Sequence, residues 1–337
     1  MFNKDNYINF FDENYFLMEA IKATTKAAAS ASDYRGRGVK NFADGLAVKE
    51  MRKSLNLINS KGIVIIGEGE ADEAPMLYFN EKLGTGWNEK NNNDGYVFEI
   101  AVDPLDGTTL CSKNVEGAVA VLAIAPEGCV LHAPDIYMNK IAVSGKNLPK
   151  DLISLDNSVL NNIKNISKAK NKEIRDLNFV VLDRDRHKEL VAKIRETGAM
   201  VTLISDGDVM GILSICNPFF NADGYFGIGG APEGVITAAM LKVVGGQIHG
   251  RLIYENDDEK NRAIKMLKKN NISDPNKEFT ENDMIKGDKC VFSSTAVTSS
   301  YMLRGVKKLG DNLYQTNTIA GSKSMGYLII DNQTSID

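Results

Sequence analysis

The stretch EIAVDPLDGTT, residues 99–109, runs from apolar residues directly into two carboxylates. The apolar residues before Asp103 predict a buried strand. Pro104 cannot donate a hydrogen bond to a neighbouring strand, so we expect the strand to end there and Asp106 to follow a turn. Both carboxylates can then point into one pocket beyond the strand, where they repel each other unless a cation lies between them.

The residues after this pair favour an anion beside such a cation. Gly107 allows a sharp backbone turn, and the N–H groups of Thr108 and Thr109 can face a phosphate if a helix or turn begins there. Asp, Pro and Gly are also common turn formers, so this stretch alone fits an ordinary surface turn equally well.

Two further glycine-lined loops carry carboxylates. GEGEADEAP at residues 67–75 follows an apolar run and contains Glu68, and GIGGAPEGVITAAML at residues 227–241 places Glu233 at the start of a predicted helix. An acid in that position can also simply stabilise the helix N-terminus. Three such loops, in a chain with only three histidines, favour an all-oxygen metal site and therefore magnesium or manganese over zinc.

The order of apolar patterns along the 337 residues predicts an α/β protein with alternating helix and sheet layers. Helices are predicted at residues 13–33, 43–59, 185–197, 231–243 and 256–269. Strands are predicted at residues 62–70, 96–104, 118–125, 178–183, 200–205 and 290–296. Residues 150–176 and 270–289 are polar and are predicted to form surface connections.

Composition excludes several classes of function. The net charge of −4, without a long basic run, gives no reason to expect a nucleic-acid partner. Acidic residues interrupt the first thirty positions, and the longest apolar run is too short to cross a bilayer, so we expect a cytoplasmic protein without a membrane partner. Four scattered cysteines without a C-x-x-C spacing argue against a zinc site and against a disulfide framework.

Several motifs carry a family resemblance. DPLDGT at residues 103–108 is similar to the central metal-binding motif of the lithium-sensitive sugar and inositol phosphatase superfamily. GEGEADEAPMLY, APDIYM, SDGDV and GIGGAPEGV resemble motifs of the class II fructose-1,6-bisphosphatase family of bacteria and occur in that family's order. The resemblance covers about residues 15–330. It implies a layered α/β/α/β/α sandwich, in which a metal-binding half at residues 1–150 and a half at residues 151–337 pack as one catalytic unit.

The resemblance also implies roles for single residues. The metal ligands would be Asp44, Glu68, Asp103, Asp106, Glu233 and the backbone carbonyl of Leu105. Thr108, with Glu68 and Asp103, would orient and deprotonate the attacking water. Lys40 and Asp44 match the family's early motif, although this chain has Val39 and Phe42 where an aspartate and a threonine are usual.

For the substrate, the resemblance implies that Arg184 and Arg186, in the sequence DRDRH, contact a distal phosphate. Taken alone, this segment fits a solvated charge run at a helix start. Further contacts to the sugar and the reacting phosphate are implied for Gly107, Thr108, Tyr137, Asp206 and Asp208. As an alternative, Asp206 could be a helix cap and Tyr137 could be a packed core residue.

The activity implied is metal-dependent hydrolysis of the 1-phosphate of fructose 1,6-bisphosphate, with Mg²⁺ or Mn²⁺ as cofactor and a homodimer or homotetramer as the assembly. Sedoheptulose 1,7-bisphosphate, as sole or second substrate, and an inositol phosphate or another sugar phosphate are alternatives. A sugar-phosphate sensor without turnover is an alternative of a different class.

Overall fold

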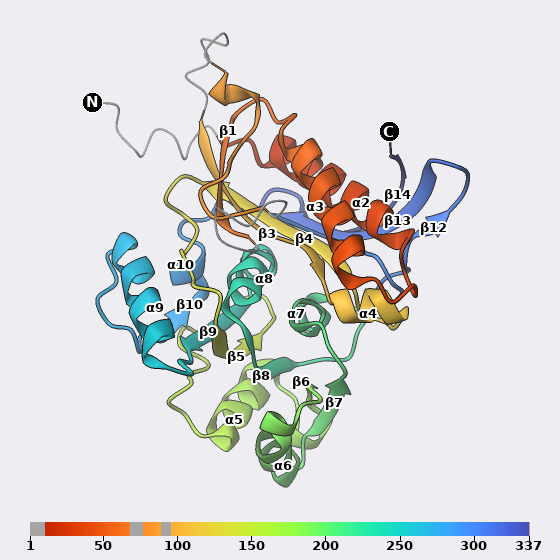
Figure 1. Cartoon of the computed structure of the whole chain (residues 1–337). Helices are drawn as coiled ribbons and strands as arrows, with labels where there is room; N and C mark the ends of the chain where they lie inside the picture. Colours follow the sequence, from red (N-terminus) through yellow and green to blue (C-terminus); the bar gives the residue numbers. More distant parts are fainter. Residues whose placement is uncertain (1–10, 68–76, 89–95, 337) are drawn as a thin grey trace. The chain divides into compact units, whose positions relative to one another are not determined.

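The computed structural model describes residues 11–67, 77–88 and 96–336 (Figure 1). The chain forms two compact units. Unit 1 consists of Met1–Leu131 together with Ile285–Asp337, and unit 2 consists of His132–Met284.

Unit 1 is built on a mixed sheet with eight strands among the described residues. The strands are β1 (Lys61–Ile66), β2 (Lys82–Leu83), β3 (Val97–Asp106), β4 (Val119–Pro126), β11 (Val291–Ala296), β12 (Lys307–Lys308), β13 (Leu313–Ser322) and β14 (Gly326–Ser335). Their order is β12-β13-β11-β4-β3-β1-β2, with β14 paired to β13. Strands β1 and β3 run parallel, and the steps from β3 through β4, β11 and β13 to β14 are antiparallel. The helices of this unit are α2 (Glu13–Ser32), α3 (Lys40–Leu55), the short α4 (Thr108–Lys113) and the 3-10 helix η1 (Thr85–Trp87).

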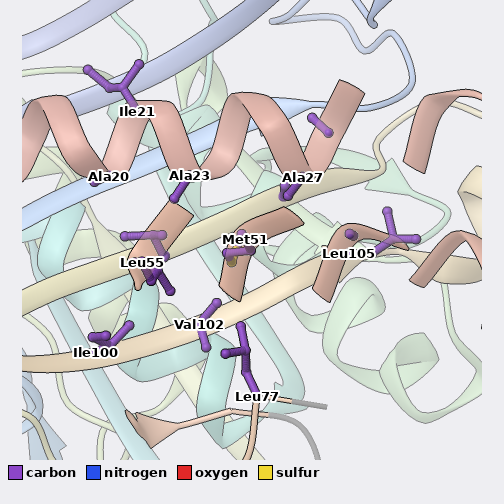
Figure 2. Packing of buried hydrophobic residues seen from close by; sticks show 14 of the residues in the cluster. Ala20, Ile21, Ala23, Ala27, Met51, Leu55, Leu77, Ile100, Val102 and Leu105 are labelled. Atoms are coloured by element: carbon purple, nitrogen blue, oxygen red, sulfur yellow. The ribbon is translucent and has the colours of Figure 1, made fainter. Parts of the chain in front are cut away.

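Helices α2 and α3 form the core of unit 1 with this sheet. The inner side of α2 is lined by fully buried alanines, including Ala23 and Ala27. Figure 2 shows these alanines gathered with Met51 and Leu55 of α3 and with Val102 of β3. Because alanine side chains are short, the long helix α2 can lie close to the other elements without leaving voids.

Unit 2 is built on a six-stranded mixed sheet. Its strands are β5 (Tyr137–Val143), β6 (Asn178–Leu182), β7 (Met200–Ile204), β8 (Gly224–Gly230), β9 (Gln247–Leu252) and β10 (Phe279–Thr280), in the order β10-β9-β5-β8-β6-β7. Its helices are α5 (Val159–Lys170), α6 (Lys188–Glu196), α7 (Asp208–Cys216), α8 (Ala231–Val244), α9 (Asp257–Lys269), α10 (Glu281–Met284) and the 3-10 helices η2 (Ile174–Asp176) and η3 (Asp185–His187).

The alternation of side chains along β8 shows that unit 2 has three layers. Phe226 packs in one apolar cluster with Ile163 of α5 and Ile194 of α6. Its neighbour Tyr225 points to the opposite face, where its ring lies against Gly211 of α7. Helix α7 contacts α8, so two helices cover each face of this sheet.

The path of β3 corrects one prediction. Strand β3 continues through Pro104 to Asp106 and does not end at the proline. Its pairing with β4 shifts register between Asp103, which pairs with Val121, and Asp106, which pairs with Val119. The proline is tolerated because it lies within this irregularity, where no regular ladder hydrogen bond is required of its nitrogen.

The α/β class is confirmed, and so are the predicted helices and strands, with shifted ends. Helix α3 begins at Lys40 and ends at Leu55, whereas the sequence predicted residues 43–59. The segments predicted as surface connections are more ordered than expected, because residues 150–176 contain α5, and residues 270–289 contain β10 and α10.

The two units differ from the division at residue 150 that was expected from the sequence. Strand β11 pairs with β4 along its whole length, and β13 and β14 continue the same sheet. The last fifty or so residues therefore join unit 1 through backbone hydrogen bonds, although they follow unit 2 in the chain.

Two leucines near the end of α3 provide a test of this core. Leu55 is fully buried, whereas Leu57, two residues later, is 68% exposed. We expect Leu55→Ala to lower the free energy of unfolding by about 2–5 kcal/mol, because it removes buried methyl groups and leaves a cavity. The matched control Leu57→Ala should change it by less than about 0.5 kcal/mol. Urea unfolding of both variants measures the difference, and equal losses would contradict the packing described for α3.

Candidate active site

The two carboxylates of the DPLDGT motif lie at the carboxyl end of β3, where its pairing with β4 is irregular. Asp103 and Asp106 are each only 9% exposed. The backbone N–H of Leu105 donates a hydrogen bond of 3.0 Å to Oδ1 of Asp103, which fixes that carboxylate against the bulge. The register shift thus places two buried carboxylates within one short turn of backbone.

Helix α4 begins directly after these carboxylates. Gly107 precedes it with φ +79°, a left-handed conformation that favours glycine. The first-turn N–H groups of α4 belong to Thr108 and Thr109, so the positive end of the helix dipole adjoins the two carboxylates. Lys40 of α3 donates a hydrogen bond of 2.7 Å to the hydroxyl of Thr109, which brings a cationic side chain to this turn.

Asp44 lies one turn after Lys40 on α3. Its Oδ1 atom is buried and has no hydrogen-bond partner among the described residues. Burial raises the pKa of Asp44 from its ordinary value of 3.8 to about 6. Burial therefore disfavours the ionised form of Asp44, and no described residue donates a hydrogen bond to its Oδ1 atom.

In unit 2, Glu233 lies in the first turn of α8. Its Oε2 atom is also buried without a hydrogen-bond partner in the described part of the chain. Burial raises the pKa of Glu233, and the nearby charge of Asp208 raises it further, whereas the charge of Lys140 lowers it. A Cβ atom on Gly230 would lie 1.8 Å from Oε2 of Glu233, so a side chain at this position would displace the carboxylate from where it lies.

A buried ion pair lies beside Glu233, and the sequence did not reveal it. The ammonium group of Lys140, whose side chain is fully buried, donates to Asp208 and, at 2.6 Å, to the carbonyl of Gly230. The Tyr225 hydroxyl donates to the other oxygen of Asp208. The only signal in the sequence was a lysine inside the apolar strand pattern YMNKIAV, because a buried lysine requires a partner.

The pair Arg184 and Arg186 lies at the carboxyl end of β6. Arg184 donates to Oδ1 of Asp206 at 2.7 Å and to the carbonyl of Ser205 at 2.5 Å. The guanidinium of Arg186 lies over the ring of Tyr137, 5.0 Å from its centroid. The structure therefore brings together Arg184 with Asp206 and Arg186 with Tyr137, as two adjacent pairs around the same strand ends.

Asp208 is placed differently from Asp206. Asp208 is 7% exposed, and its two carboxylate oxygens accept hydrogen bonds from Lys140 and Tyr225. Asp206 keeps about a third of its side chain exposed. Of the two aspartates in the SDGD turn, Asp206 is the one with surface available to a sugar.

The predicted site residues divide between the two units. Unit 1 holds Asp44, Asp103, Leu105, Asp106, Gly107 and Thr108, and unit 2 holds Tyr137, Arg184, Arg186, Asp206, Asp208 and Glu233. Glu68 lies outside the described residues.

The donor set fits a hard divalent cation. Asp44 and Glu233 each have a buried carboxylate oxygen that no described residue hydrogen-bonds, and a divalent cation would satisfy such oxygens. Oxygen donors suit magnesium or manganese. Within the described ranges, no three His, Cys, Asp or Glu side chains are close enough to hold an ion by themselves. In addition, no helix in these ranges is long and apolar enough to span a membrane.

Comparison with known proteins agrees with this chemistry. The family model described as bacterial fructose-1,6-bisphosphatase, glpX-encoded, matches residues 14–333. The D-fructose 1,6-bisphosphatase class 2/sedoheptulose 1,7-bisphosphatase of Trichodesmium erythraeum is 36% identical over 332 residues, which cover 95% of this chain and 96% of that protein. The fructose-1,6-bisphosphatase 1 class 2 of Escherichia coli is 38% identical over 311 residues, which cover 90% of this chain and 89% of that protein.

Among solved structures, the inositol monophosphatase from Anabaena matches with a TM-score of 0.34 and 14% identity, over 64% of this chain and 75% of that chain. This similarity is too low to carry a structural argument. The family match and the two relatives, in contrast, cover nearly the whole chain, and on that ground the chain belongs to the bacterial fructose-1,6-bisphosphatase family of the glpX-encoded type.

Proposed function

We propose that this protein is a divalent-metal-dependent phosphatase that hydrolyses the 1-phosphate of fructose 1,6-bisphosphate to give fructose 6-phosphate and phosphate. The observation that carries the proposal is the buried pair Asp103 and Asp106, followed directly by the N-terminus of α4, in a chain of this family. Carboxylates that attract cations and backbone N–H groups that attract a phosphate are contiguous there.

The metal ligands that we propose are Asp44, Glu68, Asp103, Asp106, Glu233 and the carbonyl of Leu105. A bound Mg²⁺ or Mn²⁺ supplies charge that neutralises the phosphoryl oxygens, lowers the pKa of water and stabilises the leaving alkoxide. Asp44 and Glu233 support the assignment because each has a buried oxygen that lacks a hydrogen-bond partner among the described residues.

The remaining roles belong to the chain's own side chains and backbone. Thr108, polarised by the carboxylate of Glu68, orients the attacking water, and the proton of the water passes to the carboxylate of Glu68 or Asp103. Gly107 and the first turn of α4 hold the reacting phosphate by backbone N–H groups.

At the other end of the substrate, Arg184 and Arg186 bind the distal phosphate, since guanidinium groups match phosphate oxygens in a bidentate way. Tyr137 and Asp206 contact the sugar. Asp208 forms a buried ion pair with Lys140 and thereby holds this lysine next to Glu233.

Sedoheptulose 1,7-bisphosphate is the second candidate substrate, because the relative from Trichodesmium erythraeum carries both activities in its name. One additional carbon changes little in a polar site, so the side chains described here do not separate the two sugars. A homodimer or homotetramer and a cytoplasmic location remain parts of the proposal.

The pH dependence of stability tests the role of Asp44. Its pKa is raised to about 6, so the folded protein holds this proton more tightly than the unfolded chain. The stabilising contribution is complete below about pH 3.8 and is lost as the pH rises through about 6. Without metal at pH 7.5, Asp44→Asn should therefore be more stable than the wild type by about 1–2 kcal/mol, after allowance for partial exposure.

Urea unfolding in EDTA between pH 4 and pH 8 measures this effect, with the exposed-site variant Glu127→Gln as a control. The advantage of Asp44→Asn should disappear toward pH 4, and added Mn²⁺ should favour the wild type. An advantage that does not change with pH would contradict a buried, uncompensated carboxylate.

Phosphate release tests the activity itself. Fructose 1,6-bisphosphate, sedoheptulose 1,7-bisphosphate and inositol 1-phosphate are compared with Mg²⁺, with Mn²⁺ and with EDTA. We expect metal-dependent release from a ketose bisphosphate, and a loss of roughly a hundredfold or more in kcat for Asp103→Asn, since it removes charge from the metal site. The control Asp185→Asn changes an exposed aspartate and should retain activity. Sugar-phosphate binding without turnover would instead support a sensor.

A further inference from the structure

The ring of His187 links strands β6 and β8 of unit 2 where their backbones no longer pair. Strands β6 and β8 are paired only at Phe179 with Gly224 and at Val180 with Tyr225. Beyond those pairs, the buried imidazole of His187 connects the two strands.

Both ring nitrogens of His187 are used. Nδ1 lies 2.8 Å from the carbonyl oxygen of Leu182, the last residue of β6, and the N–H of Ile228 in β8 donates to Nε2 at 2.8 Å. Because a backbone N–H can only donate, Nε2 must accept, and Nδ1 must carry the proton that is donated to Leu182. The neutral ring with this tautomer therefore joins β6 to β8 by one donated and one accepted hydrogen bond.

Ile228 of β8 also holds the side chain of Arg186 in place. The carbonyl of Ile228 accepts hydrogen bonds from Nε and from a terminal nitrogen of Arg186, at 3.2 and 2.8 Å. Two consecutive side chains, Arg186 and His187, thus bind the carbonyl and the N–H of one residue. In addition, the N–H of His187 donates to the carbonyl of Arg184 at 2.9 Å, which closes the turn that carries both arginines.

We infer that His187 is a positioning residue for the distal phosphate, because it fixes Ile228 as the anchor of Arg186 and closes the turn that carries Arg184. This inference rests on the proposed function, in which these two arginines bind that phosphate. His187 does not touch the substrate, and it acts by holding the guanidinium groups in place before the phosphate arrives.

Substitution of His187 by an amide residue tests the two hydrogen bonds of its ring one at a time. His187→Asn keeps a donor near the place of Nδ1 but removes the acceptor for Ile228. His187→Gln can place an acceptor near the position of Nε2. The matched control is His249→Asn, because His249 is also buried in unit 2 but bonds to Glu278 at 2.7 Å, away from the arginines.

The experiment measures the dissociation constant of fructose 6-phosphate by isothermal titration calorimetry, and the KM and kcat for fructose 1,6-bisphosphate and fructose 1-phosphate. We expect His187→Asn to weaken fructose 6-phosphate binding and to raise the KM for the bisphosphate about tenfold, because a buried N–H loses its partner and the anchor shifts. The kcat should change little. The kinetics of fructose 1-phosphate, which lacks the distal phosphate, should not change, and His187→Gln should recover most of the affinity.

A purely structural role gives a different pattern. Thermal unfolding of each variant identifies a loss of stability. If His187→Asn, His187→Gln and His249→Asn lower stability together and affect both substrates equally, the inference is overturned. It is also overturned if His187→Asn leaves the affinity for fructose 6-phosphate unchanged.

Arg186→Gln distinguishes this inference from the proposed function. If Arg186→Gln weakens fructose 6-phosphate binding but His187→Asn does not, only the positioning role fails. If Arg186→Gln and Arg184→Gln leave that binding unchanged, or the wild type does not bind fructose 6-phosphate, the assignment of the distal phosphate fails and the positioning role fails with it. Because binding is measured without turnover, a failure of catalysis alone is recognised separately.

Discussion

Buried negative charge is the constraint on which the rest of this structure depends. An ionised carboxylate inside a protein requires a compensating charge, because burial alone raises its free energy by several kcal/mol. In unit 2 the chain supplies that charge to Asp208 through the fully buried Lys140. For Asp44 and Glu233 the described residues supply no hydrogen-bond partner to one carboxylate oxygen, and burial raises the pKa of both groups. A divalent cation is the partner that this chemistry implies.

The glycines of the motif GIGG follow from the same constraint. A Cβ atom on Gly229 would lie 2.4 Å from a carboxylate oxygen of Asp208, and one on Gly230 would lie 1.8 Å from Oε2 of Glu233. Any side chain at these positions would displace a carboxylate. The sequence pattern of small residues before an acid is therefore explained by the space that the two acids need, as well as by the turn into α8.

Local patterns predicted several of the helices and strands that carry the candidate site residues, such as β3 and α8. The sequence left open whether a helix or a turn follows Gly107, and the structure shows that helix α4 begins there. The course of β3 through Pro104 was wrongly predicted, because a bulge depends on the pairing with β4 and not on the proline alone. The association of β13 and β14 with the first sheet also depends on long-range pairing, which no local pattern contains.

Partners of charged groups were the least predictable feature. Lys140 was not recognised, because a single lysine in a strand usually reaches solvent, and its partner Asp208 lies 68 residues away in the chain. Asp208 itself was assigned to the sugar, whereas its oxygens accept from Lys140 and Tyr225. His187 was read as part of a charge run, although its ring is buried between two strands.

The central claim of the proposal is that buried carboxylates of this chain, among them Asp106 and Glu233, bind divalent cations. Isothermal titration calorimetry with Mn²⁺ tests it most directly, on the wild type, on Asp106→Asn from unit 1, on Glu233→Gln from unit 2 and on the exposed-site control Asp185→Asn. We expect each of the first two variants to weaken Mn²⁺ binding at least about tenfold, or to remove a bound ion, while the control binds like the wild type. Unchanged Mn²⁺ binding in either Asp106→Asn or Glu233→Gln would contradict the claim for that unit's carboxylate.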